Sequence, residues 1–207
     1  FVVFEGVEGC GKSFQSNKLY KSLKKKKIDT ILTREPGGTK SSELIRNLIL
    51  KDYFTKDSKE KFDKYTDTLL YLAARNEHVK NKIKPALLKK KLVICDRFLD
   101  STIAYQVYGK SVDMKFINYI HKKILGKIKP NLVFILKVSA KSSKQRLKNR
   151  KFKNRYDNFS QSFYAKAQKS FLKIAKNKKN YYVLNSSSND TILEKKIFNI
   201  VKKYLRI

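Results

Sequence analysis

Residues 6 to 13 fill every required position of the pattern G-x-x-x-x-G-K-[ST], reading Gly6-Val7-Glu8-Gly9-Cys10-Gly11-Lys12-Ser13. Glycines let successive backbone N–H groups face an anion, and a helix that follows adds the positive end of its dipole. In such a loop the lysine reaches the β- and γ-phosphates of a nucleoside triphosphate, and the serine hydroxyl binds Mg²⁺. The pattern predicts a site for a nucleoside triphosphate and Mg²⁺ formed by this loop.

Arginine is rare in this chain, which contains 41 Lys but only 8 Arg. A guanidinium is a planar fork that binds phosphates and carboxylates through paired hydrogen bonds, which an ammonium cannot do. Each arginine is therefore a candidate for a binding role. All but the last lie in or beside a motif: Arg34, Arg46, Arg75, Arg97, Arg146, Arg150 and Arg155.

Two motifs follow predicted strands, where a parallel sheet forms its ligand crevice. The first, Arg34-Glu35-Pro36-Gly37-Gly38-Thr39, predicts a rigid turn with an Arg-Glu pair at its rim, the alternative being a plain turn. The second is Asp96-Arg97. There Asp96 is the expected second Mg²⁺ ligand, and Arg97 suits a second phosphate.

Side chains suited to a nucleobase lie further along the chain. Tyr71 and Arg75 are four residues apart on one helix, so a ring that stacks on a base adjoins a guanidinium that donates to its edge. Taken alone, this spacing favours core packing with a surface ion. Gln106, five residues after Ser101, offers both a donor and an acceptor to a base edge.

The last three motif arginines are Arg146, Arg150 and Arg155, in a polar segment between two predicted helices. Their spacing suits a lid, over about residues 146–158, whose cations close over a transferring phosphoryl group. A solvated basic helix is the alternative.

The elements that position these motifs alternate between short apolar runs and longer helical patterns, which is typical of a parallel sheet flanked by helices. Strands are predicted over 1–5, 29–33, 92–95, 132–138 and 181–184, and helices over 12–26, 39–50, 63–90, 112–124, 140–148, 160–176 and 190–205, with a loop over 51–62. We expect one α/β domain over residues 1–207.

Composition narrows the class of protein. At 207 residues and 41% hydrophobic content, the chain suits one globular domain, and it shows neither a secretory signal nor an apolar run long enough for a membrane span. Two cysteines, Cys10 and Cys95, form no disulfide framework, which favours a reduced, cytoplasmic protein. The net charge of +32 suggests nucleic-acid binding, but the lysines are scattered, which favours compositional bias.

Together these segments resemble the thymidylate kinase family from residue 1 to about residue 205. The resemblance rests on the phosphate loop, on Thr33-Arg34-Glu35-Pro36-Gly37-Gly38-Thr39, on Ala73-Ala74-Arg75, and on Asp96-Arg97-Phe98 followed by Ser101 and Ala104-Tyr105-Gln106. It implies a P-loop NTPase fold with a five-stranded parallel sheet and a short lid. It also implies a cytoplasmic homodimer that phosphorylates dTMP to dTDP, for dTTP synthesis, by in-line transfer from ATP with Mg²⁺.

The resemblance also implies roles for the residues around the acceptor. Glu8 binds the 3′-hydroxyl of the acceptor sugar. Arg34, Arg46 and Arg97 surround its phosphate, and Glu35 and Pro36 lie near them. Tyr71 stands where the family usually has a Phe stacked on thymine, Arg75 bonds a thymine carbonyl, Ser101 and Gln106 read the rest of the base, and Tyr105 excludes a 2′-hydroxyl.

Some members of the family carry a catalytic arginine inside the phosphate loop, at the position of Gly9 here. The chain is therefore similar to the bacterial subgroup, in which lid arginines act with Lys12 and Arg97. Arg155 matches that lid arginine best, and Arg150 comes second. An acceptor phosphate is mostly dianionic at pH 7 and needs no general base, which agrees with a sequence showing no well-placed histidine.

Two alternatives remain open at this stage. One is a P-loop kinase of another nucleoside monophosphate or of a deoxynucleoside. A deoxynucleoside kinase needs a carboxylate base such as Glu35. The other is a nucleic-acid-binding NTPase that uses the positive charge, although no helicase motif set and no aromatic RNA platform is visible.

Overall fold

The computed structural model describes residues 1–51, 60–149, 160–188 and 191–207. Five strands form one parallel sheet in the order β2-β3-β1-β4-β5. The strands are β1 Val2–Glu5, β2 Thr30–Arg34, β3 Leu92–Asp96, β4 Leu132–Lys137 and β5 Tyr181–Asn185. The predicted five-stranded parallel sheet is confirmed, and every strand boundary lies within one residue of its prediction.

The central strand β1 explains why the sheet forms around the phosphate loop. All its residues are buried, and its neighbours are β3 and β4, with Val3 opposite both Cys95 and Val133. A strand covered on both faces is expected to be largely apolar, which Val2, Val3 and Phe4 satisfy before the strand ends at the buried Glu5. The loop that follows β1 therefore starts from a rigid, buried base.

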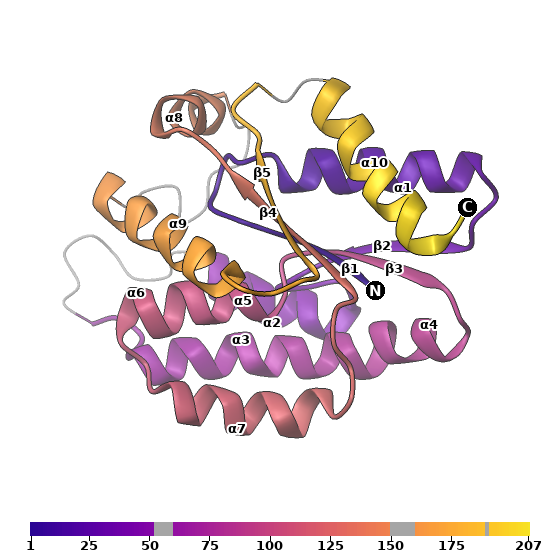
Figure 1. The fold of residues 1–207 in the computed structure, drawn as a ribbon. Coiled ribbons are helices and arrows are strands. Elements are labelled where there is room, and N and C mark those ends of the chain that lie inside the picture. The colour runs from indigo at the N-terminus through magenta and orange to yellow at the C-terminus, as the bar shows by residue number, and fades with distance from the viewer. Residues whose placement is uncertain (52–59, 150–159, 189–190) are drawn as a thin grey trace.

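Helices cover both faces of the sheet (Figure 1). On one face α1 lies beside α10; on the other, α3 lies between α2 and α7 and continues towards α4, while α9 lies beside α6. The helices are α1 Lys12–Lys25, α2 Lys40–Leu50, α3 Lys64–His78, α4 Lys84–Leu88, α5 Leu99–Thr102, α6 Tyr108–Lys110, α7 Met114–Leu125, α8 Ala140–Lys148, α9 Gln161–Ala175 and α10 Thr191–Leu205.

Two helical features differ from the sequence-based prediction. The helix expected over 63–90 is interrupted by a π-helical segment, Val79–Ile83, between α3 and α4. A second π-helical segment, Ile103–Val107, joins α5 to α6 in a stretch for which no helix was expected. Such segments occur often at functional sites, and the second carries Tyr105 and Gln106. Residues 52–59 of the expected loop lie outside the described residues.

Local capping explains where the helices beside the site begin. The Thr39 hydroxyl accepts from Ser42 N at 3.2 Å, and Ser42 Oγ accepts from Thr39 N at 2.9 Å, which forms a capping box at the start of α2. Asp63 Oδ1 accepts from Tyr65 N at 2.7 Å at the start of α3. The capping box fixes the turn before α2 and hence the end of the Arg34–Thr39 motif.

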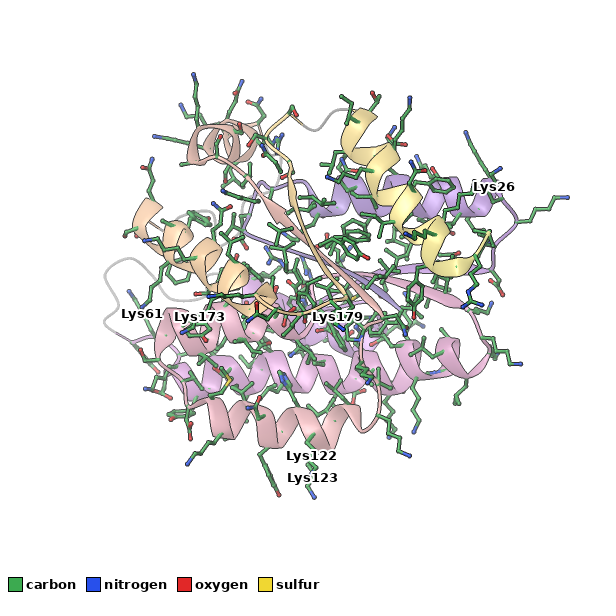
Figure 2. All side chains as sticks on the ribbon, in the orientation of Figure 1. Lys26, Lys61, Lys122, Lys123, Lys173 and Lys179 are labelled. Carbon is green, nitrogen blue, oxygen red and sulfur yellow. The ribbon has the colours of Figure 1, made fainter. Side chains whose placement is uncertain are left out.

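Basic side chains project from many elements (Figure 2). Lys26 lies at the end of α1, Lys122 and Lys123 lie on α7, and Lys173 lies on α9, so the labelled lysines point to different sides of the molecule. The charge is thus distributed rather than gathered on one element. Within the described residues, no helix combines the length and apolar character that crossing a bilayer requires.

Candidate active site

A cavity of about 510 Å³ lies at the carboxyl ends of the strands, and this volume is typical of a small-molecule site. Most residues singled out in the sequence line it: Glu8, Gly9, Gly11, Lys12, Ser13, Arg34, Glu35, Pro36, Arg46, Tyr71, Arg75, Asp96, Arg97, Ser101, Tyr105 and Gln106. The lining also includes Arg146 and Leu147 of the expected lid segment and Phe98 of the Asp96-Arg97-Phe98 motif. Phe14, Leu50 and Thr102 are lining residues that the sequence did not indicate. Segments that are far apart in the chain therefore meet at one crevice.

The phosphate loop has the backbone that its glycines predict. Gly11 precedes α1 with φ 89°, and a Cβ on Gly6 would lie 2.6 Å from the Leu136 carbonyl oxygen. Gly6, Val7 and Cys10 do not line the cavity, and the side chains of Val7 and Cys10 lie in the hydrophobic core. Any contact of these three residues with a phosphate would therefore come from the backbone.

The ammonium group of Lys12 is folded back onto its own loop. Nζ donates to the Gly6 carbonyl at 3.0 Å and to the Val7 carbonyl at 2.8 Å, and the residue is 6% exposed. Carbonyl oxygens thus stand in for the phosphate oxygens that the pattern predicts. A bound triphosphate would have to compete with these two acceptors for the lysine.

Ser13 and Asp96 meet directly, because the Ser13 hydroxyl donates to Asp96 Oδ2. Ser13 lies in the first turn of α1 and Asp96 ends β3, so the pair joins the phosphate loop to the neighbouring strand. A hydroxyl beside a carboxylate is a donor set of hard oxygens, and Mg²⁺ is commonly bound by one or two such groups together with substrate phosphates. The residues present fit the predicted magnesium site.

Arg97 is held against the phosphate loop from the other side. Nη2 donates to Glu8 Oε1 at 2.7 Å, and Nη1 donates to the Gly6 carbonyl at 2.9 Å and to Ser101 Oγ at 3.1 Å. The Tyr105 hydroxyl donates to the other Glu8 oxygen at 2.6 Å. Burial raises the pKa of Glu8, but Arg97, Lys12 and Tyr105 outweigh burial and hold that pKa below its usual value. Glu8 is therefore an ionised acceptor.

Two further arginines at the cavity share one carboxylate, Glu43. Arg34 Nη2 donates to both of its oxygens, at 3.0 and 3.2 Å, and Arg46 Nε lies 3.8 Å from Oε2. Arg46 Nη1 also donates to the Pro36 carbonyl at 2.6 Å, and Gly38 N donates to Glu43 at 2.8 Å. Glu43 thus orders the Pro-Gly-Gly turn and both cations.

Arg75 is the most deeply embedded cation of the site, at 2% exposure. Its Nε donates to Glu35 Oε2 at 2.7 Å. Burial raises the pKa of Glu35, but Arg75 and His78 outweigh it and hold the pKa below its usual value. Gln106 is buried as well, and its Nε2 has no hydrogen-bond partner within the described residues, which leaves a donor available to a ligand.

Glu5 is a buried residue of the site that sequence reasoning missed. Oε1 accepts from Phe98 N at 2.7 Å and from Ser101 N at 3.2 Å, and Oε2 accepts from the Ser101 hydroxyl at 2.6 Å. These bonds fix the turn that follows β3 and so position Arg97. Burial, followed by the charge of nearby Asp100, raises the pKa of Glu5 to about 7. Ser101, expected at the base, is thereby also a structural partner of Glu5.

Glu43 and His78 were missed too, although each has a weak local signal. Glu43 is three residues before Arg46, and His78 is three residues after Arg75, so each shares a helix face with a recognised residue. Neither spacing distinguishes a site residue from an ordinary surface pair. Glu5 has no such signal, because its partners lie 93 and 96 residues away.

The expected lid requires one correction. Arg146 lies within α8 rather than between helices, and it donates to the carbonyls of Gly9 at 3.1 Å and of Ser186 and Ser187 at 2.8 Å. Arg146 lies within α8 because the helix predicted over 140–148 continues through this residue. Its hydrogen bond to Gly9 ties α8 to the phosphate loop. Arg150 and Arg155, the predicted catalytic lid residues, lie outside the described residues.

A phosphate loop that faces a set of arginines across one cavity, on a P-loop sheet, places the chain among the nucleoside monophosphate kinases. Residues 4–197 match the model of the family described as thymidylate kinase. The thymidylate kinase of Wolbachia sp. subsp. Brugia malayi is 44% identical over 180 residues, covering 86% of this chain and 82% of the relative. That of Aster yellows witches'-broom phytoplasma is 39% identical, covering 100% of this chain and 96% of the relative.

The solved structures give the same result. The crystal structure of thymidylate kinase from Ehrlichia chaffeensis matches with a TM-score of 0.75 and 31% identity, covering 97% of both chains. The chain belongs to the thymidylate kinase family.

Proposed function

We propose that this cavity performs the reaction of the thymidylate kinase family, ATP-dependent phosphorylation of dTMP to dTDP, with the roles assigned below. One observation supports the assignment most strongly. Arg34, Arg46 and Arg97, from three different segments, line the same cavity as Lys12 and Ser13. Cations opposite the phosphate loop suit an acceptor that is itself a phosphate, and a neutral hydroxyl would not call for them.

On the donor side, the loop 6–13 binds the phosphates of ATP, and Lys12 leaves its carbonyl acceptors to contact the β- and γ-phosphates. Ser13 and Asp96 are the ligands proposed for Mg²⁺. When bound, the ion neutralises charge on the phosphate oxygens. Catalysis then consists of positioning and charge neutralisation, as expected for phosphoryl transfer to a dianionic acceptor.

On the acceptor side, Arg97 aligns the attacking phosphate oxygen, and Arg34 and Arg46 hold the same phosphate together with the turn at Glu35-Pro36. Arg34 is the most exposed of these cations, with 54% of its side chain accessible, so it is free to turn from Glu43 to an incoming dianion. Glu8, ionised and already paired with Tyr105, accepts from the 3′-hydroxyl. The packed Tyr105 ring leaves no room for a 2′-hydroxyl.

The base-binding end is formed by Tyr71, Arg75, Ser101 and Gln106, all of which line the cavity. Tyr71 stacks on the ring of thymine, and Arg75 donates to one of its carbonyl oxygens. Gln106 supplies the buried donor that has no partner among the residues that the structure describes. These groups together match a pyrimidine with acceptor oxygens on its edge.

Glu35 supports a monophosphate as acceptor. A deoxynucleoside kinase needs a carboxylate with enough basicity to take a hydroxyl proton. Glu35 is 5% exposed, its two oxygens are bound to Arg75 and His78, and its pKa lies below the usual value despite burial. A carboxylate held in this way is a weak base, and its role is structural.

The direct test measures ADP release from ATP·Mg²⁺ with dTMP, dUMP, dCMP, AMP and thymidine as acceptors in moderate salt. Fast turnover with dTMP, slower turnover with dUMP and little with the others supports the assignment. Turnover with thymidine but not with dTMP would move it to a nucleoside kinase. ATP hydrolysis that depends on added DNA or RNA would favour the nucleic-acid-binding alternative, which the spread of lysines over many elements does not support.

Three further expectations are part of the proposal. Arg155, with Arg150 second, acts on the transferring group from the part of the expected lid that follows α8 in the sequence. The chain forms a homodimer, for which the exposed apolar side chains of Leu44 and Leu48 on α2 and Leu69 on α3 provide a surface, because α2 and α3 pack side by side. A cytoplasmic location agrees with the two cysteines, which are free and buried. Light scattering of the purified chain tests the dimer.

A further inference from the structure

The chain contains two histidines, and the roles assigned above use neither of them. His78 lies at the end of α3 with 0% exposure, and His121 lies in α7 with 7% exposure. Both belong to one buried network around Arg75. Buried polar side chains are costly unless they are hydrogen-bonded, so this arrangement calls for an explanation.

His121 contacts Arg75 directly. Arg75 Nη1 donates to His121 Nε2 at 2.7 Å and to Thr102 Oγ1 at 2.8 Å. Because a guanidinium has no acceptor atom, Nε2 must be the acceptor, and the imidazole must be neutral. Burial, followed by the charge of Arg75, lowers the pKa of His121 to about 3, so the ring keeps this acceptor at neutral pH.

His78 acts on Arg75 through Glu35. Its Nδ1 lies 3.0 Å from Glu35 Oε1, and its Nε2 lies 2.6 Å from Thr33 Oγ1 at the end of β2. The other Glu35 oxygen accepts from Arg75 Nε. His78 thus holds in place the carboxylate that holds the arginine, and it ties α3 to the sheet.

Together these bonds leave Arg75 almost no freedom. Four of its five N–H groups are used, on Glu35, Thr102, His121 and the Phe98 carbonyl, the last at 2.8 Å. One Nη2 hydrogen has no acceptor within the described residues, and Arg75 lines the cavity. A guanidinium fixed on all other sides can present that N–H in only one direction.

We propose that His78 and His121 are positioning residues that fix Arg75 so that its remaining N–H selects a carbonyl over an amino group on the pyrimidine. The proposal rests on the function proposed above. A fixed donor favours the carbonyl edge of thymine and uracil and faces a second donor when cytosine presents its amino group. Sites built from fixed polar groups discriminate strongly, because a mismatched partner leaves a buried group unpaired. An arginine able to shift would lose that discrimination.

Two substitutions at His121 separate hydrogen bonding from packing. His121→Phe keeps a ring but removes the acceptor, whereas His121→Asn keeps a neutral acceptor and loses the ring. We expect His121→Phe to raise the KM for dTMP and to lower the preference for dTMP over dCMP in kcat/KM by about tenfold or more. The KM for ATP should stay within about twofold, since the donor site does not touch this network. His121→Asn should retain most of the preference.

Ile117→Val is the matched control, because Ile117 is buried in the same helix and its truncation removes packing without touching the bonds to Arg75. It should leave the preference unchanged. If His121→Phe does not fold, Thr102→Val replaces it, since it removes the other Nη1 acceptor with little change in shape. In an Arg75→Lys background, these substitutions should add nothing to the loss of preference.

The proposal is overturned if His121→Phe, or Thr102→Val where it replaces that variant, prefers dTMP over dCMP as strongly as the wild type does. It is equally overturned if His121→Asn loses as much preference as His121→Phe, because packing would then explain the effect. The wild type is assayed in parallel with dTMP. A wild type without dTMP-dependent turnover would instead refute the proposed function itself, and binding of dTMP by calorimetry would show at which step it fails.

Discussion

Arg97 and Glu8 form an ion pair that joins the end of β3 to the phosphate loop, with Nη2 and Oε1 2.7 Å apart. Arg97 also donates to the Gly6 carbonyl, so the residue assigned to the acceptor phosphate is anchored on the loop assigned to the donor. Its own backbone has φ 72°, which non-glycine residues seldom adopt. If the proposed roles hold, we expect the alignment of donor and acceptor to depend strongly on this side chain.

Replacement of Arg97 by Ala should lower kcat/KM for dTMP by about 10²–10³, the usual cost of removing one group aimed at a developing charge. The loss should appear in kcat as well as in KM, because the role proposed for Arg97 is to align the attacking oxygen. Steady-state kinetics measures both. Lys122→Ala, at an exposed lysine of α7, is the control and should change kcat/KM little. Comparable losses from both variants would remove the special role of Arg97.

The preference for dTMP over dUMP should be real but incomplete. Thymine differs from uracil by one methyl group, and a pocket gains only about 1–3 kcal/mol from such a group, which corresponds to about 10–200-fold in kcat/KM. Both bases carry the same acceptor oxygens, so Arg75 and Gln106 do not separate them. Competition between the two substrates measures the ratio. Complete rejection of dUMP would indicate a steric or polar filter that this account lacks.

Most of the fold was predictable because the central strands are mostly apolar runs. β1 and β4 are buried along nearly their whole length, and a parallel sheet with helices on both faces requires that composition. No helix was expected over the segment from Leu99 to Lys110, where the chain changes from α to π and back. That geometry depends on packing against α9, which local pattern does not encode.

The site was predictable where a short pattern contains the chemistry, as in the loop 6–13 and in Asp96-Arg97. It was not predictable where the partners are remote. His121 meets Arg75 across 46 residues, and Glu5 meets Ser101 across 96. In the sequence, a lone histidine in an amphipathic helix cannot be told from an ordinary surface or core residue. Only the folded chain shows the guanidinium that faces it.

Two glycine substitutions should separate backbone strain from steric clash. Gly38 has φ 95°, and a Cβ there would lie 2.5 Å from Thr33 Oγ1 and 2.6 Å from His78 Nε2. Gly126 also has a positive φ, of 55°, but a Cβ there meets nothing within 4 Å. Gly126→Ala should destabilise the fold by about 1–3 kcal/mol through strain alone, because φ 55° with ψ −114° is a region that side-chain-bearing residues seldom adopt.

Gly38→Ala should introduce the same kind of backbone strain and also displace the Thr33–His78 pair. We expect it to lower the free energy of unfolding by at least about 2 kcal/mol more than Gly126→Ala does. It should also raise the KM for dTMP. Urea denaturation gives the free energy of unfolding for both variants. Equal losses would mean that the turn moves away from His78 at no cost, in which case the close approach has no structural role.

The dependence of stability on pH should reflect two buried groups that act in opposite directions. Between about pH 4.5 and 7 the folded state retains a proton on Glu5 that the unfolded chain has released, so this group makes stability fall as pH rises. Between about pH 3 and 6.5 the unfolded chain protonates His121 while the folded state keeps it neutral, so this group makes stability rise with pH. Each contributes up to about 1.4 kcal/mol per pH unit.

From pH 4.5 to 6.5 the two effects should largely cancel in the wild type. Burial also raises the pKa of Asp100, so Asp100 adds to the loss of stability with rising pH that Glu5 causes. Glu5→Gln can keep the hydrogen bonds to Phe98 N and Ser101, and it should leave a free energy of unfolding that rises with pH across this window. His121→Asn should leave a free energy of unfolding that falls as pH rises across the same window. Urea titrations of the three proteins at pH 4.5, 5.5 and 6.5 measure these slopes. Parallel slopes in all three would show that neither group changes its protonation on folding, and the neutral His121 acceptor would then lack its electrostatic basis.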